Sequence, residues 1–316
     1  MKRRPHSRIH EGLTRDRGLI GSAYLADAGL RAEYAAEIAP RTEAAIAKIL
    51  APLRAELAGV RTVLDLGAGT GAAGRAVRAA LPGVDRLVSV DQVAATAGVI
   101  VADLRREVRP RGLEGRFDLV VAAHVLNEMG KSMTVQQRAA AVFAWAHELS
   151  ADGGHLLLVE PALRETSRDL LAVRDRLLDA GFFVVAPCFW QGPCPALARD
   201  RDWCHDSAPW PEGHQPAAGP RSRVDFSYLL LRRAGERPQD RRVFRVVSDP
   251  MVEKGKLRLF GCGPAGRHPL VRLDREATDD NADFAEAARG DVLVVTEVER
   301  AGDGLRVTST SRVARR

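Results

Sequence analysis

The sequence has few cysteines, few aromatic residues and no long apolar run, and each shortage excludes a class of protein. Of the 316 residues, 4 are cysteine and 5% are aromatic, whereas 28% are charged. So few cysteines favour metal ligands or free thiols over two disulfides. No stretch reaches the ~18 consecutive apolar residues of a membrane span, and no apolar run follows the basic residues 1–8. We therefore expect a cytoplasmic protein with no signal peptide and no membrane partner.

The remaining composition is that of an ordinary globular protein. A hydrophobic content of 46% and a length of 316 residues allow one large domain and a smaller one. The net charge of +6 permits a nucleic-acid partner without requiring one. Residues 1–8 are either an arm that contacts phosphates or a disordered tail.

A glycine loop follows a short apolar strand at 63–66 and precedes a helical pattern at 72–81. Glycines allow the backbone to turn tightly and to approach a ligand, and the helix N-terminus adds a positive dipole end. No Gly-Lys-Ser/Thr follows, which excludes a phosphate-binding loop. The loop resembles motif I of class I S-adenosylmethionine-dependent methyltransferases. The candidate cofactor-binding residues in it are Asp65, Gly67, Ala68, Gly69 and Gly71.

A second strand, at 86–91, ends in an acid about 20 residues after the loop. Asp91 can accept hydrogen bonds from both ribose hydroxyls of a bound nucleoside, with Gln92 beside it. A dehydrogenase uses the same device but prefers Gly-x-Gly-x-x-Gly, and residue 72 here is Ala. We therefore expect S-adenosylmethionine as the cofactor. The next helix is expected at 93–108, with Asp103 on its surface.

A third strand, at 116–123, leads to polar residues at its carboxyl end, the edge where open α/β sheets bind ligands. His124, Asn127 and Glu128 therefore lie near the expected position of methyl transfer and are candidate catalytic residues. Alternatively, they cap the helix that begins near Thr134 or orient the cofactor loop. The Asn-Pro-Pro-aromatic motif of base-amine methyltransferases is absent, as is a cysteine for carbon-5 methylation.

Alternating strand and helix patterns predict an α/β fold with a mostly parallel, doubly wound sheet. We divide the chain into a basic tail and helical preface (1–58), a methyltransferase domain (59–232) with a cysteine-rich insertion (187–223), and a small β-barrel of the oligonucleotide-binding kind (241–316). The barrel has five expected strands and a helix at 283–289. Its basic residues form either a nucleic-acid-binding face or a solvated face, and they are Arg242, Arg245, Lys254, Lys256, Arg258, Arg267 and Arg272.

The four cysteines, separated by 5, 9 and 57 residues, are Cys188, Cys194, Cys204 and Cys262. The paired Cys-x-x-Cys knuckles of structural zinc sites are absent. From the residues alone, three interpretations remain open. One is an iron–sulfur cluster, whose size tolerates dispersed ligands. The others are a zinc ion with His205 or His214 as a substitute ligand, and four free buried thiols.

Around the cysteines the sequence resembles a known family, the methyltransferase-like small-ribosomal-subunit assembly proteins of the Rsm-twenty-two and methyltransferase-like-seventeen type. The segments that carry the resemblance are Ala186-Pro-Cys188, Gly192-Pro-Cys194-Pro, Asp202-Trp-Cys204-His205 and Phe226-Ser-Tyr228. Further similarity at 36–45, 126–129, 160–161 and 289–291 extends it over nearly the whole chain. The chain is identified as a bacterial member of this family.

The resemblance implies a 4Fe–4S cluster on the four cysteines and an association with small-subunit ribosomal RNA. Two departures stand out: Phe189-Trp190 replaces Pro-His after the first cysteine, and Ala208-Pro-Trp-Pro replaces a basic segment. These changes leave the cysteines intact but alter a segment expected to contact RNA. The loop Gly-Ala-Gly-Thr-Gly is closer to active methyltransferases than the family's commoner Gly-Ala-Gly-Pro-Gly.

We therefore predict an S-adenosylmethionine-dependent methyltransferase-like iron–sulfur protein that acts on or binds small-subunit ribosomal RNA. Two alternatives remain. One is a non-catalytic ribosome-assembly factor that uses the same surfaces for binding. The other is a methyltransferase for a small molecule or a peptide.

Overall fold

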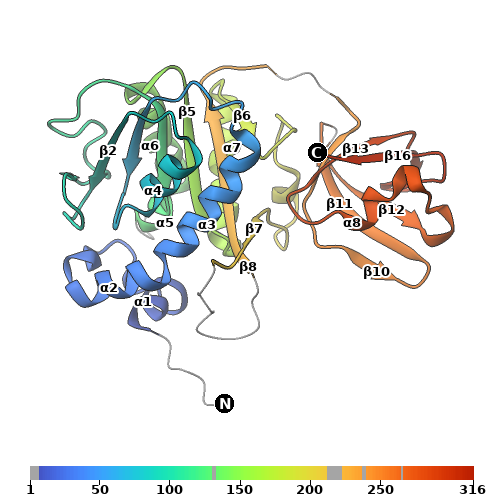
Figure 1. Cartoon of the computed structure of the whole chain (residues 1–316), viewed down its shortest axis with the longest axis horizontal. Coiled ribbons are helices and arrows are strands. Elements are labelled where there is room, and N and C mark those ends of the chain that lie inside the picture. Colours follow the sequence, from blue (N-terminus) through green and yellow to red (C-terminus); the bar gives the residue numbers. More distant parts are fainter. Residues whose placement is uncertain (1–6, 130–132, 212–222, 237–239, 265) are drawn as a thin grey trace.

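The chain folds around two β-sheets that lie side by side, as Figure 1 shows; the computed structural model describes residues 7–129, 133–211, 223–236, 240–264 and 266–316. The first sheet contains strands β1 to β8 and the second contains β9 to β16. Most of the expected basic tail and much of the loop at 208–223, including His214, lie outside the described residues. None of the helices in the described ranges has the length and apolarity needed to cross a membrane.

The first sheet has the strand order β3-β2-β1-β4-β5-β8-β6, with β7 also paired to β8. Strands β1 to β5 run parallel to one another, whereas β8 is antiparallel to β5, β6 and β7. This confirms the expected mostly parallel α/β sheet. The strands are β1 (Thr62–Leu66), β2 (Arg86–Asp91), β3 (Ile100–Val101), β4 (Phe117–Ala123), β5 (Ser150–Pro161), β6 (Phe183–Ala186), β7 (Asp206–Pro209) and β8 (Arg223–Arg232).

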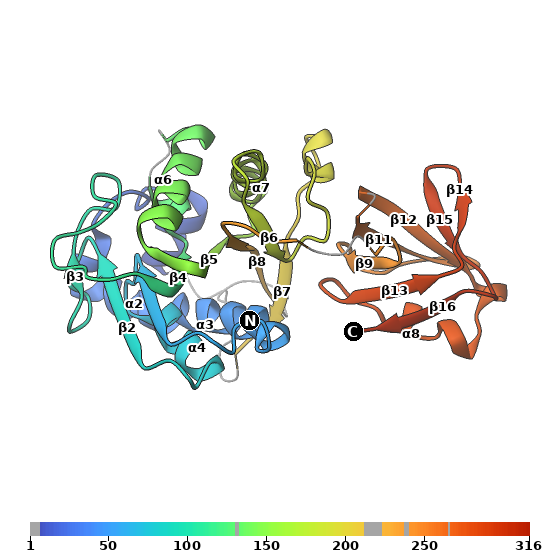
Figure 2. The same cartoon turned by 90° about the horizontal axis from the view of Figure 1, so that it is seen from above.

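Helices cover both faces of the first sheet, with α6 and α7 on one face and α3 and α4 on the other (Figure 2). Adjacent residues of β1 supply both cores: Leu64 packs with Trp145 of α6, and Val63 packs with Ile46 of α3. Strands buried on both faces are apolar throughout. The helices are α3 (Ala39–Leu50), α4 (Ala72–Ala80), α5 (Val125–Glu128), α6 (Val135–Glu148) and α7 (Arg164–Asp179).

The helical preface was expected at 19–58 with an interruption at Pro40. The structure places two principal helices there, α2 (Ala28–Glu37) and α3, after the short helical segments Arg8–His10, Glu11–Arg15 and Tyr24–Ala26. Pro40 stands in the first turn of α3, where its missing N–H is not needed by the helix. The proline therefore begins the second helix.

The prediction of a helix at 93–108 is wrong. This stretch contains the short strand β3 followed by turns. The Asp91 Oδ1 atom accepts a hydrogen bond from the Val93 N–H at 2.9 Å, and Asp103 Oδ1 accepts one from the Arg105 N–H at 3.0 Å. Such local side-chain bonds to the backbone compete with helix formation. Asp103 consequently follows a strand at the carboxyl edge of the sheet.

The second sheet contains eight strands rather than the five expected, in the order β14-β15-β12-β11-β9-β13-β16 with β10 paired to β11. This order leaves β14 and β16 at the two ends, so the closed barrel expected from the sequence is not confirmed. The short helix α8 (Asp283–Glu286) contributes Phe284 to the core of this sheet. The strands are β9 (Val243–Val246), β10 (Met251–Glu253), β11 (Lys256–Gly263), β12 (Gly266–Leu273), β13 (Val292–Thr296), β14 (Glu299–Ala301), β15 (Gly304–Val307) and β16 (Arg312–Arg315).

A buried ion pair joins the two sheets. Arg245 of β9 and Asp206 of β7 lie 2.7 Å apart, and their side chains are 5% and 7% exposed. Gly290 has a φ of +94° and lies against the Asp206 carboxylate, where a Cβ atom would collide with it. The carboxylate is therefore enclosed by elements of the second sheet.

Removing one partner of this pair should destabilise the protein strongly. Because Arg245→Ala leaves the Asp206 carboxylate buried without its cation, we expect the free energy of unfolding to fall by about 3–5 kcal/mol. The matched control is Arg242→Ala in the same region, because Arg242 is paired at the surface with Asp240 and such pairs contribute little. Equal denaturation midpoints for the two variants would contradict this.

Candidate functional site

Three glycines with positive φ form the loop between β1 and α4. Gly67, Gly69 and Gly71 have φ values of +67°, +52° and +78°, in the region that favours glycine. A Cβ atom on Gly67 would lie 2.5 Å from Val125 Cγ2, so the loop approaches α5 too closely for a larger residue. The N–H groups of Gly67 and Ala68 donate to the Val90 carbonyl at 2.8 and 3.1 Å, which holds the loop against β2.

The two candidate acids at the strand ends occupy different positions. Asp65 is 1% exposed and accepts a hydrogen bond from the Gly74 N–H at 2.9 Å, so it lies behind the loop and fixes it to α4. Burial raises the pKa of Asp65 to about 7. Asp91 accepts a hydrogen bond from the Gly69 N–H at 2.9 Å, and burial raises its pKa as well. Asp91 is thus joined to the glycine loop at the carboxyl end of β2.

A cavity of about 70 Å³ opens beside the loop and Asp91. Of the predicted site residues, it is lined by Gly67, Gly69, Asp91, Gln92, His124 and Glu128. The Asp103 side chain also lines it, although the sequence placed this residue on a helix surface. Predicting the strand β3 would have placed Asp103 at this edge of the sheet. A strand of two residues, however, has almost no periodic pattern by which it can be predicted.

Residues from the N-terminal segment cover this cavity. A helical preface of this kind commonly packs over the mouth of the domain that follows it, although simple core packing was the favoured expectation here. The Tyr24 hydroxyl donates to Glu128 Oε1 at 2.9 Å, and the Gln92 amide donates to the Ser22 carbonyl at 3.1 Å. Leu25 and Tyr34 line the same cavity. The helical preface therefore packs directly over the candidate cofactor site.

The candidate catalytic residues His124 and Glu128 face the covered cavity from α5 and the turn before it. His124 has a φ of +65°, and its Nε2 atom lies 3.1 Å from the Thr42 hydroxyl. Burial lowers the pKa of His124 to about 4, so the ring is neutral at pH 7. Burial raises the pKa of Glu128 to about 7. A carboxyl group that titrates near neutral pH is suited to accept a proton from a reacting group.

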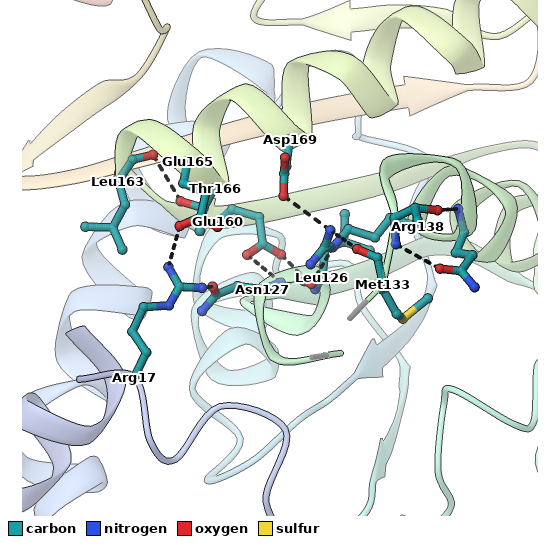
Figure 3. Close-up of polar contacts among 12 residues, drawn as sticks. Arg17, Leu126, Asn127, Met133, Arg138, Glu160, Leu163, Glu165, Thr166 and Asp169 are labelled. Carbon is teal, nitrogen blue, oxygen red and sulfur yellow. Dashed lines mark hydrogen bonds and ion pairs between the residues drawn. The ribbon is translucent and has the colours of Figure 1, made fainter. Parts of the chain in front are cut away.

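Asn127 points away from that cavity, into a second one. Its Oδ1 atom accepts a hydrogen bond from Arg17 Nη2 at 2.7 Å (Figure 3). Glu160, at the end of β5, accepts hydrogen bonds from the backbone N–H groups of Leu126 and Asn127 at 2.9 and 3.1 Å. Burial raises the pKa of Glu160 to about 8. Of the three catalytic candidates, the structure therefore brings only His124 and Glu128 to the cofactor cavity.

The four cysteines line one small, almost wholly apolar cavity of about 30 Å³ between α7 and the second sheet. None of the four forms a disulfide within the part of the chain that the structure describes. Within the described residues no group of three or more His, Cys, Asp or Glu side chains has a metal-binding arrangement, so a metal centre is not shown. Burial raises the pKa of Cys194 to about 12, and it also raises those of Cys204 and Cys262.

Arginines surround this cysteine cavity. Arg174 of α7 is 1% exposed, donates to the Gly192 carbonyl at 2.9 Å and pairs with Asp175. Arg245 Nη1 lies 3.7 Å from the sulfur of Cys204. In the second sheet, Cys262 has Arg245 opposite it on β9 and Arg267 opposite it on β12. Three arginines therefore lie beside the four thiols, and each of them is also paired with an aspartate: Arg174 with Asp175, Arg245 with Asp206 and Arg267 with Asp202.

The basic residues expected to form a nucleic-acid-binding face are mostly engaged within the protein. Arg245 is paired with Asp206, and Arg272 is buried and donates to Asn281 Oδ1 at 2.9 Å. Both Lys256 and Arg258 pair with the single carboxylate of Glu253. These contacts weaken the interpretation of the second sheet as an RNA-binding surface.

The strand order, with one antiparallel strand between β5 and β6, and the glycine loop with its acid at the end of β2 define a class I methyltransferase-like protein. More particularly, the family model described as "Mitochondrial small ribosomal subunit Rsm22" matches residues 30–272, so the chain belongs to the Rsm22 family.

Some solved structures are weakly similar. The plantazolicin methyltransferase BpumL, in complex with a pentazolic desmethylPZN analog and SAH, has a TM-score of 0.44 and 11% identity over 71% of this chain and 98% of its own. A putative RNA methyltransferase, PH1948 from Pyrococcus horikoshii, has a TM-score of 0.38 and 15% identity over 60% of this chain and 84% of its own. At these TM-scores the fold assignment depends on the strand order alone. No curated protein matches the chain.

The three buried carboxyl groups make stability depend on pH. The folded-state pKa values of Asp65, Glu128 and Glu160 are about 7, 7 and 8, above their ordinary values of 3.8, 4.5 and 4.5. The folded protein therefore binds more protons than the unfolded chain across this window, and stability falls as the pH rises through it.

We expect the melting temperature to decrease as the pH is raised from about 6.5 to about 8.5, as measured by calorimetry. Below about 6.5 the lowered pKa of the buried His124 acts in the opposite direction, so that range is left out of the test. Glu128→Gln keeps an oxygen acceptor for Tyr24 and removes one of the titrating groups, so its decrease should be smaller. A melting temperature that rises across this range would contradict the assignment of raised pKa values.

Proposed function

We propose that the chain is a methyltransferase-like iron–sulfur protein that binds S-adenosylmethionine and acts on or binds small-subunit ribosomal RNA. The observation that carries the cofactor part is the placement of the Asp91 carboxylate over the glycine loop, at the carboxyl edge of the sheet. Membership of the family described as mitochondrial small ribosomal subunit Rsm22 supports the ribosomal part. A bacterial source and a cytoplasmic location remain part of the proposal.

The residues around the loop suit S-adenosylmethionine chemically. Asp91 would accept hydrogen bonds from the ribose hydroxyls, and Asp103 and Gln92 line the same cavity. Asp65 would act indirectly, by fixing the loop through Gly74. The cavity of about 70 Å³ is much smaller than the cofactor, so Tyr24 and Leu25 must move when it binds.

If methyl transfer occurs, Glu128 is the group best placed to receive the proton that the acceptor loses. The bound cofactor supplies a methyl group on a positively charged sulfur, and the protein mainly has to position the acceptor. Glu128 titrates near neutral pH and would give up its hydrogen bond with Tyr24. His124 is neutral and held by Thr42, so it would orient groups rather than carry charge.

We assign the 4Fe–4S cluster to Cys188, Cys194, Cys204 and Cys262, with zinc as the alternative metal. A cluster bound by four thiolates carries net negative charge, and Arg174, Arg245 and Arg267 would compensate it. The ligands come from the cysteine loop beside α7 and from β11. The cluster would therefore join the two sheets and stabilise the loop.

One observation favours a second function, that of a ribosome-assembly factor without catalysis. The N-terminal segment closes the cofactor cavity through Tyr24, Leu25 and Ser22, which contact Glu128, the glycine loop and Gln92. A protein that no longer uses a cofactor can retain such a closed arrangement.

The cofactor assignment is tested with Asp91→Ala. We expect S-adenosylmethionine binding in calorimetry to weaken at least tenfold, because the ribose hydroxyls lose their acceptor. The matched control is Asp85→Ala, an exposed acid just before the same strand. In a deletion strain, a ribosomal RNA methyl mark restored by the wild type but not by Asp91→Ala would establish catalysis. If the protein binds S-adenosylmethionine but the deletion strain loses no ribosomal RNA methyl mark, the non-catalytic assembly factor is favoured.

The metal assignment is tested by purification without oxygen, followed by iron, sulfide and zinc analysis. We expect four irons and four sulfides per wild-type chain, and none in Cys262→Ser, because a cluster needs one thiolate per iron. In Cys262→Ser the second sheet should also unfold at a lower temperature than in the wild type, whereas S-adenosylmethionine binding should be unchanged. Arg258→Lys on the same strand is the control. A colourless wild-type protein with one zinc would overturn the cluster.

A further inference from the structure

A second cavity, of about 260 Å³, lies on the other side of α5 from the cofactor cavity. The residues of α5 line both: Val125 and Glu128 face the cofactor cavity, and Leu126 and Asn127 face the second one. The wall between the two cavities is thus a single helical turn at the carboxyl end of β4. Figure 3 shows the polar side chains that gather on the second side, from the N-terminal segment, β5, α6 and α7.

The size of this cavity limits what it can hold. At about 30 Å³ for each water molecule, its volume equals that of roughly nine waters. A single heterocyclic base is smaller than that volume, which leaves room for part of its ribose. A ligand of this kind would have its sugar and phosphate at the open side of the cavity.

The charges around the cavity disfavour an anion. Arg17 lies 3.7 Å from Glu165, and Arg138 lies 3.2 Å from Asp169. Glu160 adds a third carboxyl group. A phosphate group would have to separate both ion pairs and then lie beside the carboxylates of Glu165 and Asp169. A neutral ligand that donates hydrogen bonds leaves these pairs intact.

The polar and apolar groups also match the shape of a base. Leu126, Leu170 and Val173 provide apolar walls that can lie against the faces of a flat ring. Asn127 has its Oδ1 atom occupied by Arg17, so its amide nitrogen is the group that can donate to a ring nitrogen. The carboxyl groups beside it are acceptors for an exocyclic amino group.

We propose that this second cavity receives one unpaired adenine or cytosine base of a single-stranded RNA, with the amino group of the base facing the carboxyl groups and Asn127. The choice of RNA as the ligand rests on the proposed function. Because α5 separates the two cavities, the bound base would position the strand beside the cofactor site and would not itself receive the methyl group. Binding of the base itself does not require the cofactor.

The test measures binding of short single-stranded oligoribonucleotides by fluorescence anisotropy. We expect oligo(A) or oligo(C) to bind at least tenfold more tightly than oligo(U) or an abasic strand of the same length. Asn127→Ala removes the amide, and Val173→Phe fills the cavity. Each variant should lower the affinity for the preferred strand about tenfold, towards that of the abasic strand, a loss of the size expected for one base contact.

Two controls separate this proposal from the cofactor assignment. Val252→Ala, on an exposed apolar residue of β10, should bind the strands as the wild type does, and S-adenosylmethionine binding is measured on every variant. Binding that does not depend on the base, or an Asn127→Ala variant that binds like the wild type, would overturn the proposal. If the wild type binds strands selectively by base but does not bind S-adenosylmethionine, the proposal for this cavity is supported and the cofactor assignment is rejected.

Discussion

The two hydrogen bonds from the backbone of α5 to Glu160 fix the part of the structure on which both cavities depend. Helix α5 is only four residues long, too short to be stable by itself. The Glu160 carboxyl group, at the end of β5, accepts the N–H groups of Leu126 and Asn127. Its acid form is stabilised by burial, so the anchor is retained with little charge in the interior. Without it, the turn that carries Glu128 and Asn127 would lose two of its hydrogen bonds to β5.

Much of the fold could be predicted because its signals are local. The strand that precedes the glycine loop, the helices at α6 and α7 and the acid at Asp91 each follow from apolar periodicity, caps or glycine spacing. The prediction of a helix at 93–108 failed for a physical reason. The apolar residues of this stretch have helical spacing, but the side chains of Asp91 and Asp103 bind nearby backbone N–H groups and hold turns instead.

The sequence was enough to predict the glycine loop and the polar residues at the strand ends of the candidate site, but not the residues that cover them. Tyr24 reaches Glu128 across 104 positions of the chain, and Arg17 reaches Asn127 across 110. No local pattern encodes contacts of that separation. The basic residues of the second sheet show the same limit. Their charge was visible in the sequence, but the partners that neutralise Arg245 and Arg258, such as Asp206 and Glu253, could be assigned only after the strands were paired.

The junction between the sheets follows one electrostatic rule, that buried charge must be compensated. Arg245 satisfies Asp206 and also lies beside the Cys204 sulfur, so one guanidinium serves both the ion pair and the cysteine cavity. Arg174 and Arg267, beside the same thiols, are likewise paired, with Asp175 and Asp202. Each of these cations therefore has a carboxylate partner, and through Arg245 the ion pair and the cysteine cavity form one unit.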